Sequence, residues 1–197
     1  MTRKRVLKLP VIVSALAGLA GGLPVTTQAT AGENHSQPIC DGRSSYTSRR
    51  LDSERVDNLC ETYKGKVLLV VNTASRCAFT DQYAGLERLY ARYKHRGLEV
   101  VGFPSNDFAN QEPGDEKSIK SFCRLTYGVQ FPMYAKTRVQ GGGADPFYKA
   151  LADAAGQSPR WNFHKYLIDR EGRLAGSYNS FIEPQSDKLT QAIEALL

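Results

Sequence analysis

Cys77 is the residue of this 197-residue sequence whose surroundings best suit a chemical role. It lies within residues 74–80, after a continuous apolar run and before a stretch with helical spacing. At such a strand-to-helix corner a thiol faces unpaired backbone N–H groups and the positive end of the helix dipole, and Arg76 is adjacent. Each of these favours the thiolate, the nucleophilic form of cysteine. We therefore predict a reactive sulfur; the alternative is a small buried thiol in the core, the commoner fate of a free cysteine.

The elements that would position Cys77 form a strand–helix–strand unit. Residues 66–72 and 98–103 are continuous apolar runs rich in β-branched residues, typical of strands buried on both faces. Between them apolar residues recur at spacings of 3 and 4, as in an amphipathic helix, and Gly97 can end that helix. The apolar face consists of Tyr83, Leu86, Leu89, Tyr90 and Tyr93. We expect parallel strands with a right-handed crossover, and open α/β sheets bind ligands where Cys77 lies, at the carboxyl ends of the strands.

Three further helices and a hairpin are expected after this unit. Asp115 can cap one helix, and Asp145 followed by Pro146 can start another. Residues 166–169 and 174–178 flank a short turn that contains glycine, which predicts a β-hairpin. The apolar faces comprise Ile119, Phe122, Cys123, Thr126 and Tyr127 in the first helix, Phe147, Ala150, Leu151 and Ala154 in the second, and Leu189, Ile193 and Leu196 in the last. This layout predicts an α/β, thioredoxin-like fold in which helices flank a central mixed sheet, with an N-terminal β-hairpin. The fold alone does not identify an activity.

The N-terminal part of the chain differs from the rest in charge and hydropathy. Residues 1–31 hold four basic residues and no acidic one, and residues 11–20 form an apolar stretch shorter than the ~20 residues of a membrane span. With the small-x-small sequence at 29–31, this pattern predicts a cleavable signal peptide and a periplasmic or secreted protein; the alternative is an uncleaved N-terminal anchor. Residues 32–45 are polar and indicate a linker, followed by one domain at 46–197.

Composition and charge exclude several classes of function. A content of 41% hydrophobic and 23% charged residues is that of an ordinary globular domain. Removal of the first 31 residues would lower the net charge from +6 to +2, so we expect no nucleic-acid partner, and no stable membrane span in the mature chain. His35, His95 and His164 lie far apart and are not aligned with cysteine pairs, so we expect no metal site.

Four segments, taken in order along the chain, carry a resemblance to a known family. They are residues 65–80 (GKVLLVVNTASRCAFT), 102–108 (GFPSNDF), 111–114 (QEPG) and 161–166 (WNFHKY). Together they resemble the glutathione peroxidase family of thiol peroxidases, over most of the expected domain. The resemblance implies an enzyme without a prosthetic cofactor, which uses a thioredoxin-like protein or glutathione as its reducing co-substrate.

The resemblance also implies a catalytic group of four residues, in which Cys77 is the peroxidatic sulfur and Gln111, Trp161 and Asn162 assist it. Indole and amide N–H groups can donate to a sulfur anion, or to the leaving oxygen of a peroxide, without becoming charged themselves. Without the resemblance, Trp161 would be interpreted as a core aromatic residue and Gln111 as a loop-capping amide.

Several positions depart from the usual pattern of the family. Ala78 and Asp81 stand where Gly and Pro are usual, and residues 109–110 are Ala-Asn where Gly-rich residues are common. Ser105 occupies a position that is often Cys in non-vertebrate members, and Asp107 one that is often Gln. None of these removes a member of the catalytic group, but Ala78 beside the nucleophile could alter the geometry of the loop.

Cys123 matches the resolving cysteine of family members that use thioredoxin, by its Phe122-Cys123 motif and its separation of 46 residues from Cys77. The implied cycle oxidises Cys77 to a sulfenic acid, condenses it with Cys123 to a disulfide, and reduces that disulfide with a dithiol protein. Cys123 lies on the apolar face of its expected helix, so the disulfide would require local unwinding. The alternative is that Cys123 is a buried core thiol and that glutathione resolves the sulfenic acid.

Cys40 and Cys60 lie outside the catalytic group and flank the expected N-terminal hairpin. In an exported protein they would be oxidised, so we expect a structural disulfide that holds the N-terminal arm. The alternative, a second redox relay, is disfavoured because nothing around either residue would activate its thiol.

The resulting hypothesis is a thiol peroxidase that reduces hydrogen peroxide and organic or lipid hydroperoxides. One alternative is a thioredoxin-like disulfide reductase or isomerase, but such proteins use Cys-x-x-Cys and here Thr80 stands three residues after Cys77. Another is a peroxide-sensing module that passes its oxidation to a partner. Only a measurement of catalytic turnover would distinguish this sensor from the enzyme. The segment 151–160 is shorter than the loop that tetrameric members of the family carry near this point, so we expect a monomer.

Overall fold

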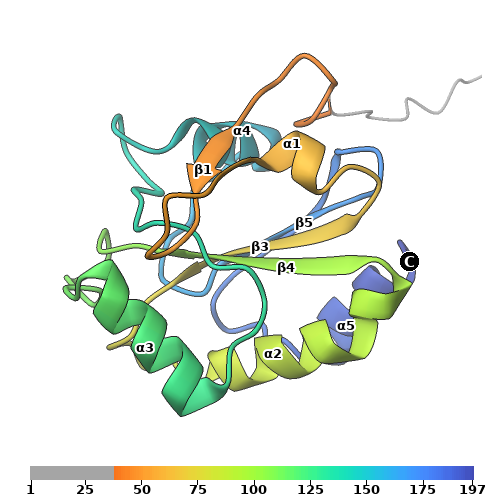
Figure 1. The fold of residues 1–197 in the computed structure, drawn as a ribbon. Helices are drawn as coiled ribbons and strands as arrows, with labels where there is room; N and C mark the ends of the chain where they lie inside the picture. Colours follow the sequence, from red (N-terminus) through yellow and green to blue (C-terminus); the bar gives the residue numbers. More distant parts are fainter. Residues whose placement is uncertain (1–37) are drawn as a thin grey trace, which may run out of the picture. The chain divides into compact units, whose positions relative to one another are not determined.

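The computed structural model describes residues 38–197 and contains a four-stranded mixed sheet in the order β4-β3-β5-β6 (Figure 1). β3 (Val67–Thr73) pairs in parallel with β4 (Leu98–Pro104). On its other edge β3 pairs in antiparallel fashion with β5 (Lys165–Ile168). β5 in turn pairs in antiparallel fashion with β6 (Leu174–Tyr178). The expected parallel pair, hairpin and mixed sheet are therefore confirmed. The predicted signal peptide lies outside the described residues.

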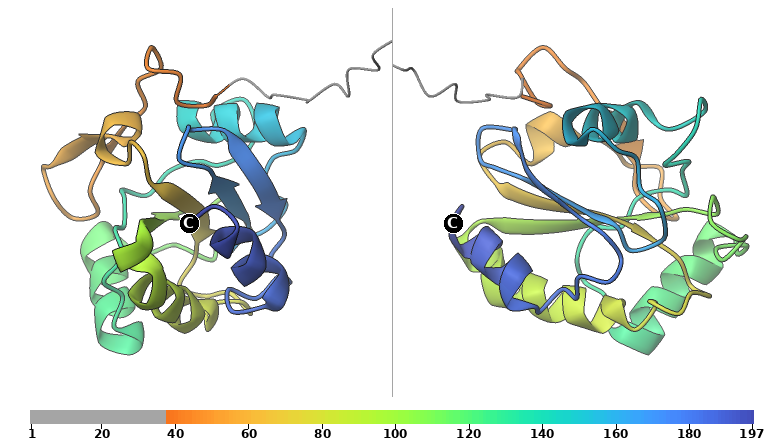
Figure 2. Two further views of the ribbon diagram at one scale, coloured as in Figure 1. Left: turned by 90° about the vertical axis from the view of Figure 1, so that its right-hand side faces the viewer. Right: turned by 180° about the vertical axis from the view of Figure 1, so that it is seen from behind.

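Two hydrophobic clusters, one on each face of the sheet, explain why β3 is buried along its whole length. The alternating side chains of a strand point to opposite faces. Val67, Leu69 and Val71 pack with α2 (Gln82–Tyr93), α3 (Glu116–Tyr127) and α5 (Asp187–Glu194). Leu68 and Val70 pack on the opposite face with α1 (Leu59–Thr62) and α4 (Pro146–Ala155). Figures 1 and 2 show these two helical layers on either side of the sheet.

The predicted helix ends are confirmed by their capping contacts. The Asp115 carboxylate accepts from the Ser118 N–H at 2.8 Å, and that of Asp145 accepts from the Phe147 N–H at 2.8 Å, with Pro146 in the first turn. α2 is extended by a 3-10 turn (Lys94–Arg96) and ends at Gly97, whose φ of 105° is in the left-handed region that favours glycine.

Two residues of the expected helical faces are placed differently by the structure. Thr126 was expected on the apolar face of α3, but it is exposed. The helix ends at Tyr127. Gly128, in the left-handed conformation, follows it, and this turn brings Val129 into the core in place of Thr126. Leu196 was expected in the last helix, but α5 ends at Glu194 and Leu196 packs on the core from the segment that follows.

The expected N-terminal hairpin is present as β1 (Thr47–Arg49) and β2 (Val56–Asn58). Its buried Asp57 accepts from the Tyr134 hydroxyl at 3.0 Å and pairs with the guanidinium groups of Arg50 and Arg55. Tyr134 also shares a hydrogen bond of 2.6 Å with the Tyr63 hydroxyl. Because every partner of the buried carboxylate is a donor, the hairpin is attached to the core without an unpaired charge.

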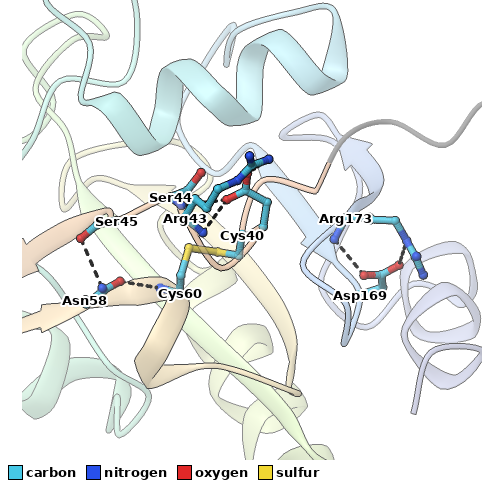
Figure 3. The surroundings of a disulfide bond; sticks show 9 residues. Cys40, Arg43, Ser44, Ser45, Asn58, Cys60, Asp169 and Arg173 are labelled. Carbon is cyan, nitrogen blue, oxygen red and sulfur yellow. Dashed lines mark hydrogen bonds and ion pairs between the residues drawn. A yellow bond between two sulfur atoms is a disulfide. The ribbon is translucent and has the colours of Figure 1, made fainter.

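Cys40 and Cys60 form a disulfide, which attaches the arm before β1 to the start of α1 (Figure 3). The preceding Ile39 is buried and its N–H donates to the Gly172 carbonyl at 2.8 Å. Gly172 has a φ of 80°, and a Cβ there would lie 2.8 Å from the Cys40 carbonyl oxygen. The close packing of these two segments therefore requires glycine at position 172. Ile39 and Cys40 of the expected linker are thus packed against the domain, whereas Asp41, Gly42 and Arg43 are exposed. No helix within residues 38–197 is long and apolar enough to cross a membrane.

Replacement of both Cys40 and Cys60 by Ser should lower the free energy of unfolding by about 3 kcal/mol, because the disulfide closes a chain segment of 20 residues. Urea unfolding followed by circular dichroism measures this. Reduction of the parent should lower its stability by the same amount and leave the double variant unaffected. An equal midpoint for oxidised parent and double variant would contradict the assignment.

Candidate active site

Cys77 lies half-buried at the corner between β3 and α2, as the sequence predicts. The turn is held by Thr80, whose hydroxyl accepts from the Cys77 N–H at 2.9 Å and donates to the Ala74 carbonyl at 3.1 Å. The Phe79 N–H donates to the Cys77 sulfur at 3.5 Å. The corner thus places a backbone donor against the sulfur, at the position where the sequence predicts a reactive residue.

The two departures from the family pattern nearest to the sulfur are accommodated locally. Ala78 is exposed and is not among the residues with left-handed backbone, so its methyl group meets no constraint that would demand glycine. The Asp81 carboxylate accepts from the Tyr127 hydroxyl at 2.9 Å and so connects the start of α2 to the end of α3.

Gln111 lies on the loop after β4, and its backbone attaches this loop to the Cys77 corner. The Gln111 carbonyl accepts from the Arg76 N–H at 3.0 Å, and the Ser75 hydroxyl donates to the Glu112 carboxylate at 3.1 Å. Ala109 and Asn110, just before Gln111, have φ values of 51° and 52°. These left-handed conformations cost free energy in non-glycine residues, and they explain why glycine is common there in the family.

Asn162 joins the loop of Gln111 to the turn before β5. Its buried Nδ2 donates to Gln111 Oε1 at 2.9 Å, which leaves the Gln111 NH2 group without an acceptor among the described residues. Trp161 is 37% exposed, and its ring lies 5.7 Å from that of Phe108. Asn72 Nδ2 donates to the Trp161 carbonyl at 3.1 Å. The indole and amide donors are thus carried by loops that hydrogen bonds join to one another.

Within the described residues, neither the indole nor the two amides hydrogen-bond to the Cys77 sulfur; its donor is the Phe79 N–H. The Gln111 amide and the Trp161 indole remain available for the oxygen atoms of a bound substrate. Asn162 Oδ1 and Glu112 Oε1 are buried and have no hydrogen-bond partner within residues 38–197, so both could accept from a bound ligand or water.

Cys123 lies on α3 and is only 1% exposed. Burial raises the pKa of its thiol to about 11, and the nearby Glu112 carboxylate acts in the same direction, although the Tyr83 hydroxyl opposes them. Cys77 and Cys123 are both free thiols in this structure. The burial of Cys123 keeps its sulfur from solvent, and the local unwinding expected for a disulfide with Cys77 stays a prediction.

Sequence reasoning missed two residues that shape the site, Asn72 and Thr80. Both are buried. Asn72 is a polar residue at the end of an apolar run, which is the signal that could have indicated its role, whereas no such signal marks Thr80. His164, two residues after Asn162, hydrogen-bonds to Ser177 at 2.9 Å. Burial lowers the pKa of His164 to about 4, so its imidazole is neutral at physiological pH.

Among residues 38–197 no cluster of three or more candidate ligands could hold a metal ion.

Comparisons with known proteins match this chain to one family. The sequence model described as Glutathione peroxidase matches residues 45–152. A glutathione peroxidase-like peroxiredoxin of Saccharomyces cerevisiae is 47% identical over 139 residues, which cover 68% of this chain and 84% of that protein. A hydroperoxy fatty acid reductase of Synechocystis sp. is 45% identical over 162 residues, 77% of this chain and 94% of that protein.

Solved structures agree with the fold. The crystal structure of Trgpx in its apo form has a TM-score of 0.61 at 34% identity, and the match covers 81% of this chain and 97% of that one. A thioredoxin-family thiol:disulfide interchange protein from Chlorobium tepidum, with a TM-score of 0.58 at 17% identity over 77% of this chain and 92% of that one, shares the fold. The thioredoxin-like architecture predicted from the sequence is thereby confirmed.

Iodoacetamide at pH 8 should modify Cys77 and spare Cys123 in the folded protein. A thiol with a pKa of about 11 is thiolate in only about one molecule in a thousand at that pH, and Cys123 is buried as well. Peptide mapping by mass spectrometry measures both sites. In 8 M urea the two cysteines should react alike, and equal labelling of both without denaturant would contradict the structure.

Proposed function

The chain belongs to the glutathione peroxidase family and is a thiol peroxidase that reduces hydroperoxides, and on this premise we propose that Cys77 is its peroxidatic residue. The observation that carries the proposal is the Phe79 N–H directed at a half-buried sulfur, beside a loop that holds Gln111. A backbone donor stabilises the sulfur anion, and the amide and indole remain for the oxygen atoms of the substrate.

In the first step the Cys77 thiolate attacks one oxygen of the hydroperoxide. The S–O bond forms as the O–O bond breaks, sulfur is oxidised to the sulfenic acid, and the leaving alkoxide or hydroxide takes a proton from solvent. The N–H groups of Gln111 and Trp161 stabilise the negative charge that develops on the leaving oxygen. Asn162 orients Gln111, because its Nδ2 occupies Gln111 Oε1 and turns the NH2 group away.

In the second step Cys123 resolves the sulfenic acid. Because the thiol is buried on α3, we propose that the helix unwinds locally, which exposes Cys123 to water and returns its pKa toward the ordinary range of cysteine. Its thiolate then attacks the Cys77 sulfur, hydroxide leaves to form water, and a disulfide results. A thioredoxin-like dithiol protein restores both thiols by exchange. The alternative is that glutathione attacks the sulfenic acid and Cys123 takes no part.

A groove that includes Phe79, whose N–H donates to the Cys77 sulfur, supports hydroperoxides with an apolar chain as substrates. It has a volume of about 500 Å³ and is lined in part by Phe79, Trp161 and Phe181. Phe181 is 79% exposed, and its ring meets that of Phe79 edge-on with centroids 5.1 Å apart. Exposed aromatic surface that continues to a reactive residue favours an apolar ligand. The Synechocystis relative is named for such substrates, the hydroperoxy fatty acids.

The site also bears on the alternative function of a disulfide reductase. In the Cys-x-x-Cys pattern the second thiol would occupy position 80, but Thr80 uses its hydroxyl to brace the corner through Cys77 and Ala74. A peroxide sensor would use the same Cys77 and Cys123, but it would react with peroxide once, whereas the enzyme reacts through many cycles.

We further propose that the protein is exported after cleavage near Ala31 and acts as a monomer in the periplasm or outside the cell. The disulfide between Cys40 and Cys60 supports an oxidising compartment.

Turnover of hydrogen peroxide with an excess of a thioredoxin-type reductant should persist for many cycles in the parent and vanish in Cys77→Ser. Cys123→Ser should consume one equivalent of peroxide and then stop, because its sulfenic acid forms but is not resolved. Peroxide loss, measured by a ferrous-xylenol orange assay, separates these outcomes. Full turnover of Cys123→Ser with glutathione would favour the glutathione alternative, and a single burst from the parent would favour the sensor.

Phe181→Ala should lower kcat/KM for linoleic acid hydroperoxide by about tenfold and leave kcat/KM for hydrogen peroxide unchanged. Contact of an apolar chain with a phenyl ring is worth about 1.5 kcal/mol, which is close to a factor of ten. Val56→Ala, which truncates a 59% exposed side chain on β2, is the matched control and should change neither value. An equal loss with both substrates would contradict the role of the groove.

A further inference from the structure

The turn that carries Trp161 and Asn162 depends on a strained residue. Phe163, which follows them, has a φ of 62° and is fully buried. A left-handed conformation is unfavourable for a bulky aromatic residue and persists only where the surrounding contacts enforce it. Two contacts do so here: the Phe163 N–H donates to the Asn72 carbonyl at 2.7 Å, and the Phe163 carbonyl accepts from Lys165 Nζ at 2.8 Å.

Lys165 is an unusual residue to find at this position. It is the first residue of β5, opposite Val71 of the central strand, and it is 0% exposed. Its second acceptor is Gln82 Oε1 at 2.6 Å, and no carboxylate of the described residues lies within ion-pair distance of it. Burial lowers the pKa of Lys165 to about 7, with a weaker opposing effect of the Glu183 carboxylate. An apolar side chain would fill this place in the core without the penalty of burying an ammonium group.

The two acceptors of Lys165 belong to a closed set of contacts that reaches the catalytic turn. Gln82 is the first residue of α2, and its Nε2 donates to the Ser180 carbonyl at 2.7 Å. The Ser180 hydroxyl in turn donates to the Asn162 carbonyl at 2.6 Å. The set therefore joins the start of α2, five residues after Cys77, to both Asn162 and Phe163. A lysine suits the junction because its terminal nitrogen, on a flexible stem, donates to both Gln82 Oε1 and the Phe163 carbonyl.

We propose that Lys165 is a positioning residue for peroxide reduction: it holds Phe163 in the left-handed conformation and, through Gln82 and Ser180, fixes Trp161 and Asn162 relative to the Cys77 corner. The inference rests on the function proposed above for these residues. Without Lys165 the Cys77 corner would keep its geometry, because the contacts of Phe79 and Thr80 with Cys77 are local. The indole and amide donors would no longer be held at the position where they can donate to the peroxide oxygens during the attack of the Cys77 sulfur.

Two rates measured on the reduced full chain test the proposal: oxidation of Cys77 by hydrogen peroxide and its alkylation by iodoacetamide. Alkylation requires only the thiolate, whereas oxidation also requires the donors. Lys165→Met should lower the oxidation rate constant by roughly tenfold or more, since small misplacements of catalytic groups have effects of this size, and should change alkylation by less than about twofold. Lys165→Arg, which keeps a cationic donor, should recover part of the loss. Lys149→Met, at an exposed lysine of α4, is the matched control.

Fluorescence gives an independent readout, because Trp161 is the sole tryptophan of the chain. Its emission maximum and anisotropy should change in Lys165→Met and remain as in the parent in Lys149→Met. Should Lys165→Met fail to fold, Ser180→Ala removes one hydrogen bond of the set and should lower the oxidation rate in the same selective way, by a smaller factor.

Three outcomes would overturn the proposal. Parent-like oxidation and emission in folded Lys165→Met, or in Ser180→Ala if the former does not fold, would show that the contacts do not position the donors. An equal fall of oxidation and alkylation would show that Lys165 acts on the thiolate instead. If the parent protein is alkylated at Cys77 but does not react with peroxide, the proposed function itself is refuted. This outcome concerns the parent and not the variants, so it is distinct from the other two.

Discussion

The hydrogen bond from the Phe79 N–H to the Cys77 sulfur, in the turn before α2, is the interaction on which this site depends. β3 is buried along its whole length, so the corner that follows it begins from a fixed position. Thr80 takes up the Cys77 N–H and the Ala74 carbonyl, and the Phe79 N–H is left to face the sulfur. In the proposed mechanism, the loops of Gln111 and Trp161 then bring uncharged donors to the leaving oxygen of the substrate.

The two free cysteines occupy opposite environments, and this difference orders the reaction. Cys77 is half-buried and faces a backbone donor, whereas Cys123 is enclosed by apolar side chains with a carboxylate nearby. A thiol of the second kind is inert until its helix moves. In the proposed cycle peroxide therefore oxidises Cys77 first, and α3 can move before the Cys123 thiol takes part.

Local sequence patterns were sufficient to predict the strands, most helix boundaries and the placement of Cys77. Continuous apolar runs and the Asp145-Pro146 start are decided by neighbours in the chain, so they can be recognised without tertiary information. Thr126 was misplaced because the end of α3 at Gly128, rather than helical periodicity, decides which side chain reaches the core. The contacts of Lys165 could not be predicted, since a buried lysine contradicts the usual preference of the residue and its acceptors come from distant parts of the chain.

The packing of Ile39 against Gly172 has a consequence for the neighbouring disulfide. Cys40 is held beside the turn between β5 and β6 by contacts that do not involve its sulfur. If the dithiol that recycles the enzyme also cleaves this bond, the two thiols stay close together, at a high effective concentration. Re-oxidation is then an intramolecular event, so the bridge restores itself whenever an oxidant is present, and the substrate of the enzyme is such an oxidant.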